Sequence, residues 1–250
     1  MPHPLLARTA TDVLLGGWSD LASPAAAASL ARTGLDWVLL DMQHGEHDDR
    51  SVRDCLRGTR PGDAPVLVRP PRNDAQDIGR ALDAGAAGVV VPMVSSAEQA
   101  RAAARACRYA PRGNRSWGPH ALDAALPAPT PEQADADVLC AVMVETRAGL
   151  ADVDAIAATE GVDVVFVGPF DLSLELGTTV DDLLAADGED DPLPTIARAC
   201  AAHGVVPGAF AATAARARRF RELGFRFLAA ATDSGLLQDG ARQRVAQLRG

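Results

Sequence analysis

Residues 161–177 read GVDVVFVGPFDLSLELG, and this stretch indicates the fold class of the whole chain. In the run VDVVFV nearly every position is apolar, so a strand formed there would be buried on both faces. Strands of this kind are typical of parallel sheets that are covered by helices. The same pattern recurs in DWVLL at residues 36–40 and in AGVVVPM at residues 87–93. The sequence therefore predicts an α/β protein.

Outward from this stretch, short β-branched runs alternate with segments rich in Ala, Arg and Leu. Eight strands are predicted: Val13 to Trp18, Asp36 to Leu40, Pro65 to Arg69, Gly88 to Pro92, Leu139 to Val144, Asp163 to Val167, Val205 to Phe210 and Phe225 to Ala230. Helices are predicted between them: Pro24 to Thr33, Asp48 to Gly58, Ala75 to Ala84, Ala97 to Tyr109, Gly149 to Thr159, Leu193 to His203 and Thr213 to Leu223. Strict alternation over eight strands favours a closed (β/α)8 TIM barrel over an open sheet.

No linker or break in composition divides the chain, so residues 1–250 are predicted to form a single barrel domain. Two long interruptions, Pro111 to Asp137 and Thr178 to Pro192, are predicted to be loops on the barrel rim. Glycine stands where several predicted helices end, as at Gly204, because a helix commonly ends on a left-handed residue.

Charge and composition exclude several classes of partner. The net charge of −9 argues against a nucleic acid or an anionic membrane, since both bind basic surfaces. No apolar run approaches the roughly 20 residues that a transmembrane helix needs, and the N-terminus lacks the pattern of a signal peptide. The four cysteines are far apart and form no C-x-x-C pair, so reduced thiols in a cytoplasmic protein are expected.

The chain contains no lysine, because all 24 basic residues are arginines. Schiff-base chemistry and lysine-anchored pyridoxal phosphate both require a lysine amine and are therefore excluded. If this protein stabilises a carbanion beside a carbonyl group, a metal ion, arginine or backbone N–H groups must do so.

Candidate site residues follow from the rule that catalytic groups of such barrels lie at the C-terminal ends of the strands or in the loops just after them. The second strand is followed by Asp41 and His44, and the third ends at Arg69. The fifth strand is followed by Glu145, and the sixth by a segment that runs from Gly168 to Asp171. A barrel would gather these residues around one mouth.

The residue types at this mouth suit metal-assisted chemistry. Two carboxylates, Glu145 and Asp171, suit Mg2+ or Mn2+, which usually take one or two protein carboxylates and leave sites for substrate oxygens. A 2-oxo acid could supply those oxygens, and Arg69 adds a permanent cation beside a developing enolate. Histidine moves protons near neutral pH, so His44 is the candidate acid/base, with Asp41 or another carboxylate orienting its ring.

Each of these residues alone has an ordinary structural interpretation. A carboxylate after a strand can cap the next helix, a histidine in a polar loop is usually a surface residue, and Arg69 can pair with a carboxylate at the edge of the core. Their convergence on one rim favours the functional interpretation. Trp18 and Trp117 are predicted to be packing residues, and a surface position is expected for His47.

The motifs together resemble the HpcH/HpaI aldolase family of metal-dependent, class II pyruvate aldolases. The resemblance runs from about Gly16 to Leu237 in the strings GLDWVLLDMQHGEHD, PVLVRPPRND, LDAGAAGVVVPMVSSAEQA, RYAPRGNRSWGP, VETRAGL and EGVDVVFVGPFDLSLELG. It implies a (β/α)8 barrel of the phosphoenolpyruvate/pyruvate type and a homo-oligomer, commonly a hexamer. It also implies a divalent ion, Mg2+ or Mn2+, with Co2+ as a further candidate.

The resemblance assigns a role to each matched position. His44 is the acid/base with Asp41 as its partner, and Asp83, in LDAGA, raises the basicity of that histidine. Arg69 stabilises the transition state, and the metal ligands are Glu145 and Asp171. The substrate-binding segment begins at Gly168, where the backbone N–H of Phe170, next to Asp171, binds the substrate carboxylate.

Three positions depart from the family pattern. Met143 stands where many members have a glutamine that contacts the pyruvate unit, and a thioether cannot donate that hydrogen bond. The common D-G-E-H is D-M-Q-H at residues 41–44. Phe170 replaces a small residue, so the site is expected to be narrower near the carboxylate.

The leading prediction is an aldolase that cleaves or forms 4-hydroxy-2-oxo acids, so that its partners are a small 2-oxo acid and an aldehyde. A second hypothesis keeps the site and changes the reaction to decarboxylation, another condensation, or acyl-CoA cleavage like that of citrate lyase β-type proteins; Met143 keeps it open. A third, from another class, is a non-catalytic binding protein on the same barrel. The presence of His44, Arg69, Glu145 and Asp171 argues against it.

Overall fold

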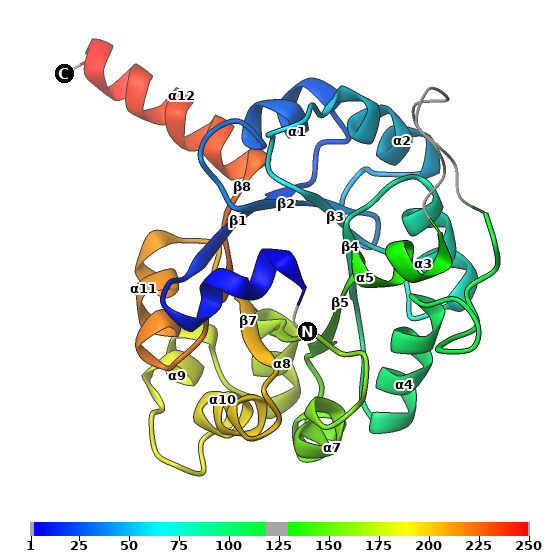
Figure 1. The fold of residues 1–250 in the computed structure, drawn as a ribbon. Helices are drawn as coiled ribbons and strands as arrows, with labels where there is room; N and C mark the ends of the chain where they lie inside the picture. The colour runs from blue at the N-terminus through cyan, green and yellow to red at the C-terminus, as the bar shows by residue number, and fades with distance from the viewer. Residues whose placement is uncertain (1–2, 119–129, 250) are drawn as a thin grey trace.

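The computed structural model describes residues 3–118 and 130–249, and its centre is a closed barrel of eight parallel strands in chain order (Figure 1). The strands are β1 (Leu14–Ser19), β2 (Trp37–Asp41), β3 (Val66–Arg69), β4 (Gly88–Val91), β5 (Leu139–Val144), β6 (Val164–Val167), β7 (Val206–Phe210) and β8 (Phe227–Thr232). Each overlaps a predicted strand. The predicted (β/α)8 TIM barrel is confirmed.

Helices follow the strands and form the outer layer. They are α1 (Pro24–Leu30), α2 (Asp49–Gly58), α3 (Ala75–Asp83), α4 (Ala97–Ala106), α5 (Pro131–Ala136), α6 (Arg147–Ala151), α7 (Val153–Ala157), α8 (Pro169–Leu176), α9 (Val180–Ala185), α10 (Pro192–His203), α11 (Ala214–Glu222) and α12 (Asp233–Arg249). Gly204 ends α10 in the left-handed region, at φ 68°, as its position predicted. All seven predicted helices are present.

Six helices depart from the sequence-based expectation: α6 and α7 replace one expected helix, and α5, α8, α9 and α12 were not expected. The expected helix Gly149 to Thr159 is divided at Asp152, whose carboxylate accepts the backbone N–H of Ala97 at 2.7 Å. Short helices α5 and α9 occupy parts of the two predicted loops, and each begins at a capping threonine, Thr130 or Thr179. Helix α8 begins directly after β6. Residues 119–129 of the first predicted loop lie outside the described residues.

Large aromatic side chains fill the inside of the barrel. Trp37 is fully buried and stacks on Phe227 with 4.2 Å between ring centroids, and Phe166 meets both rings edge-on. A Cβ on Gly16 would lie 2.1 Å from Trp37 Cε2, so only glycine leaves room for this indole. The 3-10 helix η1 (Pro4–Ala10), blue in Figure 1, adds Leu6 to this inner cluster at the N-terminal ends of the strands. The barrel is therefore a packed support for its opposite end.

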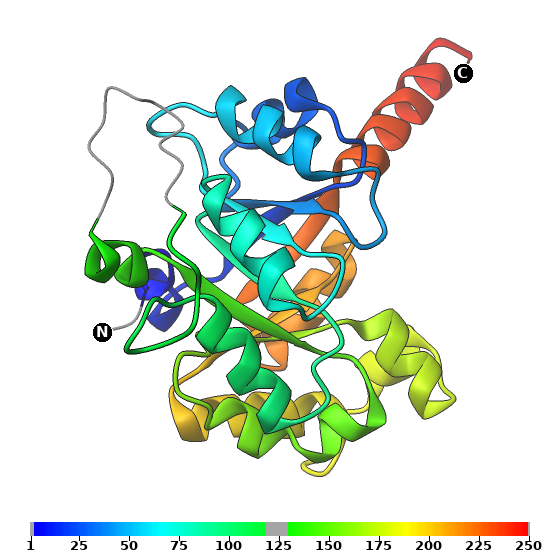
Figure 2. The ribbon, with the colours of Figure 1, turned by 90° about the vertical axis from the view of Figure 1, so that its right-hand side faces the viewer.

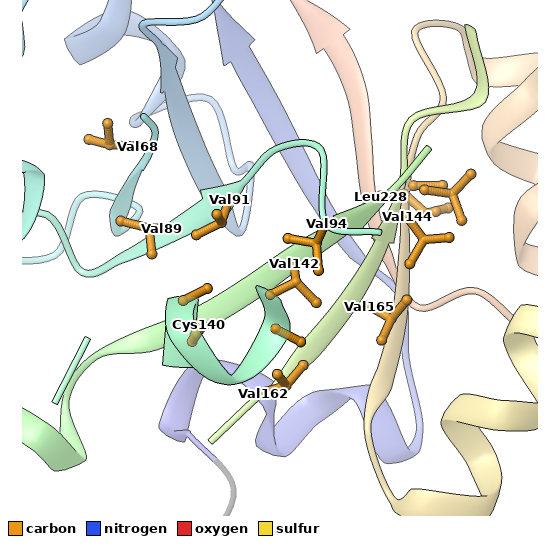
Figure 3. Close-up of a cluster of buried hydrophobic side chains, with 14 of the residues drawn as sticks. Val68, Val89, Val91, Val94, Cys140, Val142, Val144, Val162, Val165 and Leu228 are labelled. Atoms are coloured by element: carbon orange, nitrogen blue, oxygen red, sulfur yellow. The ribbon is translucent and has the colours of Figure 1, made fainter. Parts of the chain in front are cut away.

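A second core lies between the strands and the surrounding helices. The strands contribute mainly valines to it, such as Val89, Val142 and Val165, all fully buried (Figure 3), and the helices contribute many alanines and leucines. Strands buried on both faces explain the continuous apolar runs in the sequence.

Helix α12 departs from this layered arrangement, because it projects away from the barrel along most of its length (Figures 1 and 2). Asp233, at its first position, is its one buried residue among those described. Leu236, Leu237, Val245 and Leu248 are exposed. Over the described ranges, 3–118 and 130–249, no helix combines the length and apolar character that crossing a membrane requires.

Candidate active site

A cavity of about 300 Å³ opens at the C-terminal ends of the barrel strands. Of the residues singled out from the sequence, eight line it: Asp41, His44, Arg69, Met143, Glu145, Gly168, Phe170 and Asp171. They come from β2, β3, β5, β6 and the loops that follow these strands, as the strand-end rule predicted. The structure thus brings together all but one of the predicted site residues.

The floor of the cavity contains a buried ion pair between neighbouring strands. Asp41, at the end of β2, lies opposite Arg69, at the end of β3, in the strand register. Nε of Arg69 donates to Asp41 Oδ1 at 2.8 Å and Nη2 donates to Oδ2 at 2.5 Å. Burial alone raises the pKa of Asp41, but the hydrogen bonds and charge of Arg69 outweigh burial and hold this pKa below its ordinary value. The pair presents a fixed guanidinium to the cavity.

Asp41 also shapes the loop that carries His44. Its Oδ1 accepts the backbone N–H groups of Gln43 at 2.9 Å and His44 at 3.3 Å. Within the described part of the chain, the His44 ring makes no hydrogen bond to Asp41. The Asp41 carboxylate, which was predicted to orient the imidazole ring, therefore holds the loop backbone at His44 instead. The exposed imidazole remains free to meet a substrate in the cavity.

Glu145 follows β5 and is almost fully buried. Its Oε1 accepts the backbone N–H of Met93 at 2.7 Å, whereas Oε2 is buried without a hydrogen-bond partner among the described residues. Burial raises the pKa of Glu145, and the nearby charge of Asp171 raises it further. Met93 follows β4 with φ at 58°, a strained conformation for a residue other than glycine, and thereby points its N–H toward the carboxylate.

Gly168 and helix α8 complete this side of the cavity. A Cβ at position 168 would lie 2.2 Å from Glu145 Oε2, so glycine is required for the carboxylate to occupy its place. Helix α8 begins after Gly168 without a side-chain cap, which leaves its first N–H groups, including that of Phe170, without intrahelical partners. Asp171 lies in the first turn of α8 with its side chain exposed.

The structure does not bring Asp83 to the cavity. Asp83 is the last residue of α3, and its carboxylate accepts a hydrogen bond from Arg115 Nη2 at 2.7 Å. Helices of a β/α barrel run antiparallel to the strands, so the end of α3 lies far from the mouth. In the described part of this subunit, Asp83 makes no hydrogen bond or ion pair with His44.

Besides Pro169, which lies within the predicted segment from Gly168 to Asp171, three residues that line the cavity were not among the predicted site residues. Trp18, predicted as a packing residue, donates from Nε1 to Asp41 Oδ2 at 3.2 Å, and the Arg69 guanidinium lies 4.9 Å from its ring centroid. Phe210 ends β7. Asp20 follows β1, and burial raises its pKa. Trp18 and Phe210 are the last residues of their predicted strands, so the strand-end rule could have selected them.

A buried polar network supports the rim beside these residues. Ser19 Oγ donates to Asp233 Oδ2 at 2.8 Å and lies 3.1 Å from Nε2 of His47. Asp233 also accepts the backbone N–H of Asp20 at 2.9 Å. The expectation of a surface position for His47 is wrong, because this network and the start of α2 bury the ring.

The four cysteines are free and buried, in agreement with the sequence-based expectation. Burial raises the pKa of Cys55 to about 11 and that of Cys200 to about 12. Since the thiolate is the reactive form, neither is a candidate nucleophile.

Comparison with known proteins agrees with this architecture. Residues 14–240 match the model of the HpcH/HpaI aldolase/citrate lyase family. A hydroxypyruvate/pyruvate aldolase from Roseovarius nubinhibens is 39% identical over 95% of this chain and 93% of its own length. A 4-hydroxy-2-oxo-heptane-1,7-dioate aldolase from Klebsiella pneumoniae is 36% identical over 93% and 88%. The crystal structure of a family protein from Burkholderia cenocepacia superposes with a TM-score of 0.87 at 32% identity, covering 98% of this chain and 99% of the other.

Proposed function

Because this chain belongs to the HpcH/HpaI aldolase/citrate lyase family, we propose that it is a divalent-metal-dependent aldolase that cleaves and forms 4-hydroxy-2-oxo acids. Pyruvate and hydroxypyruvate, the donors in the names of its relatives, are the proposed 2-oxo acids. The observation that carries the metal dependence is the buried Oε2 of Glu145, which has no hydrogen-bond partner among the described residues. Its side chain lines the same cavity as Asp171 and Arg69.

The residues present fit a divalent ion. An ionised oxygen buried without a partner is unfavourable, and a cation at this position would remove the penalty. The described residues contain no group of three or more His, Cys, Asp or Glu side chains placed to hold a metal. Two carboxylates, Glu145 and Asp171, are a sufficient protein contribution for Mg2+ or Mn2+, with Co2+ as a further candidate. When bound, the ion supplies Lewis-acid stabilisation of negative charge on the 2-oxo group.

Arg69 and the start of α8 are proposed to position the 2-oxo acid. Nε and Nη2 of Arg69 are engaged by Asp41, whereas Nη1 makes no hydrogen bond within the described residues. Nη1 can therefore donate to the oxygen that becomes negatively charged as the carbon–carbon bond breaks. The free N–H of Phe170, at a helix N-terminus, is proposed to bind the substrate carboxylate.

His44 is proposed to transfer the proton. In cleavage, an imidazole nitrogen takes the proton of the 4-hydroxyl group as the aldehyde leaves, and in the reverse direction it returns that proton to the aldehyde oxygen. Asp41 acts on this step through the loop backbone. Asp83 could raise the basicity of a histidine only by reaching His44 of another subunit, which accords with the predicted homo-oligomer.

The broader expectations complete this proposal. The protein is proposed to work in the cytoplasm, where its four free thiols remain reduced. Residues 1–250 are proposed to act as one domain, and sedimentation analysis would determine whether the subunits form the hexamer that the resemblance implies.

Proton NMR of pyruvate in D2O tests the proposed chemistry without knowledge of the aldehyde. With Mg2+, we expect the methyl signal to disappear by exchange, and chelation with EDTA to stop the exchange. Glu145→Gln should slow it by on the order of a hundredfold, since the metal contributes several kcal/mol to charge stabilisation. Glu98→Gln, an exposed change on α4, is the matched control. Absence of exchange in protein shown to bind Mg2+ would contradict the pyruvate-enolate proposal.

A further inference from the structure

The mouth of the barrel has two chemically different halves. On one half, His44, Arg69 and Glu145 lie at or just after the ends of β2, β3 and β5. On the other half, Trp18, Phe210 and Phe170 bring aromatic rings from β1, β7 and the start of α8, beside the carboxylates of Asp20 and Asp171. We propose that this aromatic wall binds the tail of the acceptor aldehyde, and that the enzyme prefers uncharged aldehydes with an apolar, aryl-sized tail to aldehydes with a distal carboxylate. The inference rests on the proposed aldolase function.

The three rings of the aromatic wall form a continuous surface. The centroids of Trp18 and Phe210 are 5.0 Å apart at 72°, and those of Phe210 and Phe170 are 6.1 Å apart at 57°. Strand β8 lies between β7 and β1 and contributes alanines at residues 229–231, so no large side chain from β8 separates the rings. The edge-to-face and tilted arrangements are those that aromatic rings favour.

Neighbouring side chains hold the rings of the wall in place. Trp18 is held by its hydrogen bond to Asp41 and by the Arg69 guanidinium over its ring. The Arg216 guanidinium lies 5.6 Å from the Phe170 centroid. Phe170 nevertheless remains 45% exposed, and Phe210 is partly exposed. An apolar tail placed against these rings would remove their surface from water, which favours binding.

The charges around the wall oppose an anionic tail. Arg69 uses Nε and Nη2 on Asp41, and its one remaining amino group faces the proposed 2-oxo acid. Arg216 uses Nε and Nη2 on Asp181, at 3.1 and 3.0 Å. The carboxylate of Asp20 also lines the cavity. A distal carboxylate would therefore meet a like charge, and among the described residues Arg69 is the only arginine that lines the cavity.

The test compares two acceptors with pyruvate as donor in the Mg2+-loaded protein. We expect kcat/KM for benzaldehyde to exceed that for succinic semialdehyde at least tenfold. Phe210→Ala should lower kcat/KM for benzaldehyde by roughly tenfold, the scale expected from lost aromatic contact and apolar burial, and change that for the semialdehyde less than twofold. Leu174→Ala, at a residue of α8 that is 76% exposed and outside the cavity lining, is the control and should leave the ratio unchanged.

A charge variant tests the second part of the inference. Asp20→Asn should raise kcat/KM for succinic semialdehyde, because it removes a negative charge that repels the distal carboxylate. The ratio of kcat/KM for benzaldehyde to that for the semialdehyde should therefore fall. A preference of the unmodified enzyme for the semialdehyde, or an equal loss for both acceptors in Phe210→Ala, would overturn the inference. Pyruvate methyl exchange, followed in parallel, distinguishes a failure of this inference from a failure of the proposed aldolase function. Exchange without acceptor preference refutes the inference alone, whereas loss of both exchange and aldol product refutes the aldolase proposal beneath it.

Discussion

Removal of the Asp41 carboxylate should expose how much the fold depends on the ion pair at the cavity floor. The Asp41 and Arg69 side chains are 2% and 8% exposed, so Asp41→Ala leaves a guanidinium buried without its counter-charge. It also removes the acceptor for Trp18 Nε1 and for the backbone N–H groups of Gln43 and His44. Breaking one side of a buried pair typically costs about 3–5 kcal/mol.

This loss corresponds to a fall in melting temperature of roughly 6–20 °C for a protein of this size. The measurement is urea unfolding followed by circular dichroism, supported by a thermal melt. Asp239→Ala is the control, because Asp239 and Arg242 form a pair on α12 with side chains 76% and 71% exposed. Such a surface pair contributes about 0–1 kcal/mol.

A double variant distinguishes the destabilisation caused by the unpaired buried guanidinium from that caused by the lost hydrogen bonds. Asp41→Ala combined with Arg69→Met removes both charges, so it should recover about 2 kcal/mol or more relative to Asp41→Ala alone. Aldol activity should be abolished in the double variant, because the guanidinium is missing. If the double variant is no more stable than Asp41→Ala, or if Asp41→Ala costs no more than Asp239→Ala, the reasoning about the buried charge is wrong.

Three further outcomes are expected. Burial lowers the pKa of His47, so the unfolded state binds its proton more readily. The free energy of unfolding should therefore fall as pH drops below about 6.5. In urea titrations at pH 7.5 to 5.5, His47→Gln should make the free energy of unfolding depend less on pH, and an unchanged dependence would contradict this. Gly168→Ala should weaken Mn2+ binding at least about tenfold in titration calorimetry, because its Cβ displaces Glu145 Oε2, whereas Gly79→Ala, with no atom within 4 Å of the added Cβ, should not. Trp37→Ala should cost about 3–5 kcal/mol in urea unfolding, since it empties the inside of the barrel; a loss below about 1 kcal/mol would show that the barrel interior collapses around the gap.

The barrel and most of its site could be predicted from the sequence because both depend on local patterns. Apolar runs such as residues 162–167 mark strands buried on both faces, and a parallel barrel places every strand end at one mouth. This rule alone selected Glu145 and Asp171 from different strands. The family resemblance then assigned their roles.

Contacts between distant segments could not be predicted in this way. Trp18 reaches Asp41 because β1 pairs with β2 in a register that the sequence of neither strand specifies. His47 is buried because Ser19 and Asp233, 214 positions apart, meet beside it. Asp83 shows the opposite error, a predicted interaction that the fold does not form. Its motif matched the family, but its place at the end of α3 keeps it from His44 in the same subunit.

Helix α12 gives the single subunit an uneven resistance to hydrogen exchange. Its first residue is anchored in the buried network with Ser19, so amides there should open only when the barrel opens. The turns beyond contact little of the barrel, and an isolated helix of this length is marginal in water. Amide exchange should therefore quicken steadily toward Arg249. Any surface that covers α12 would be revealed by a loss of this gradient.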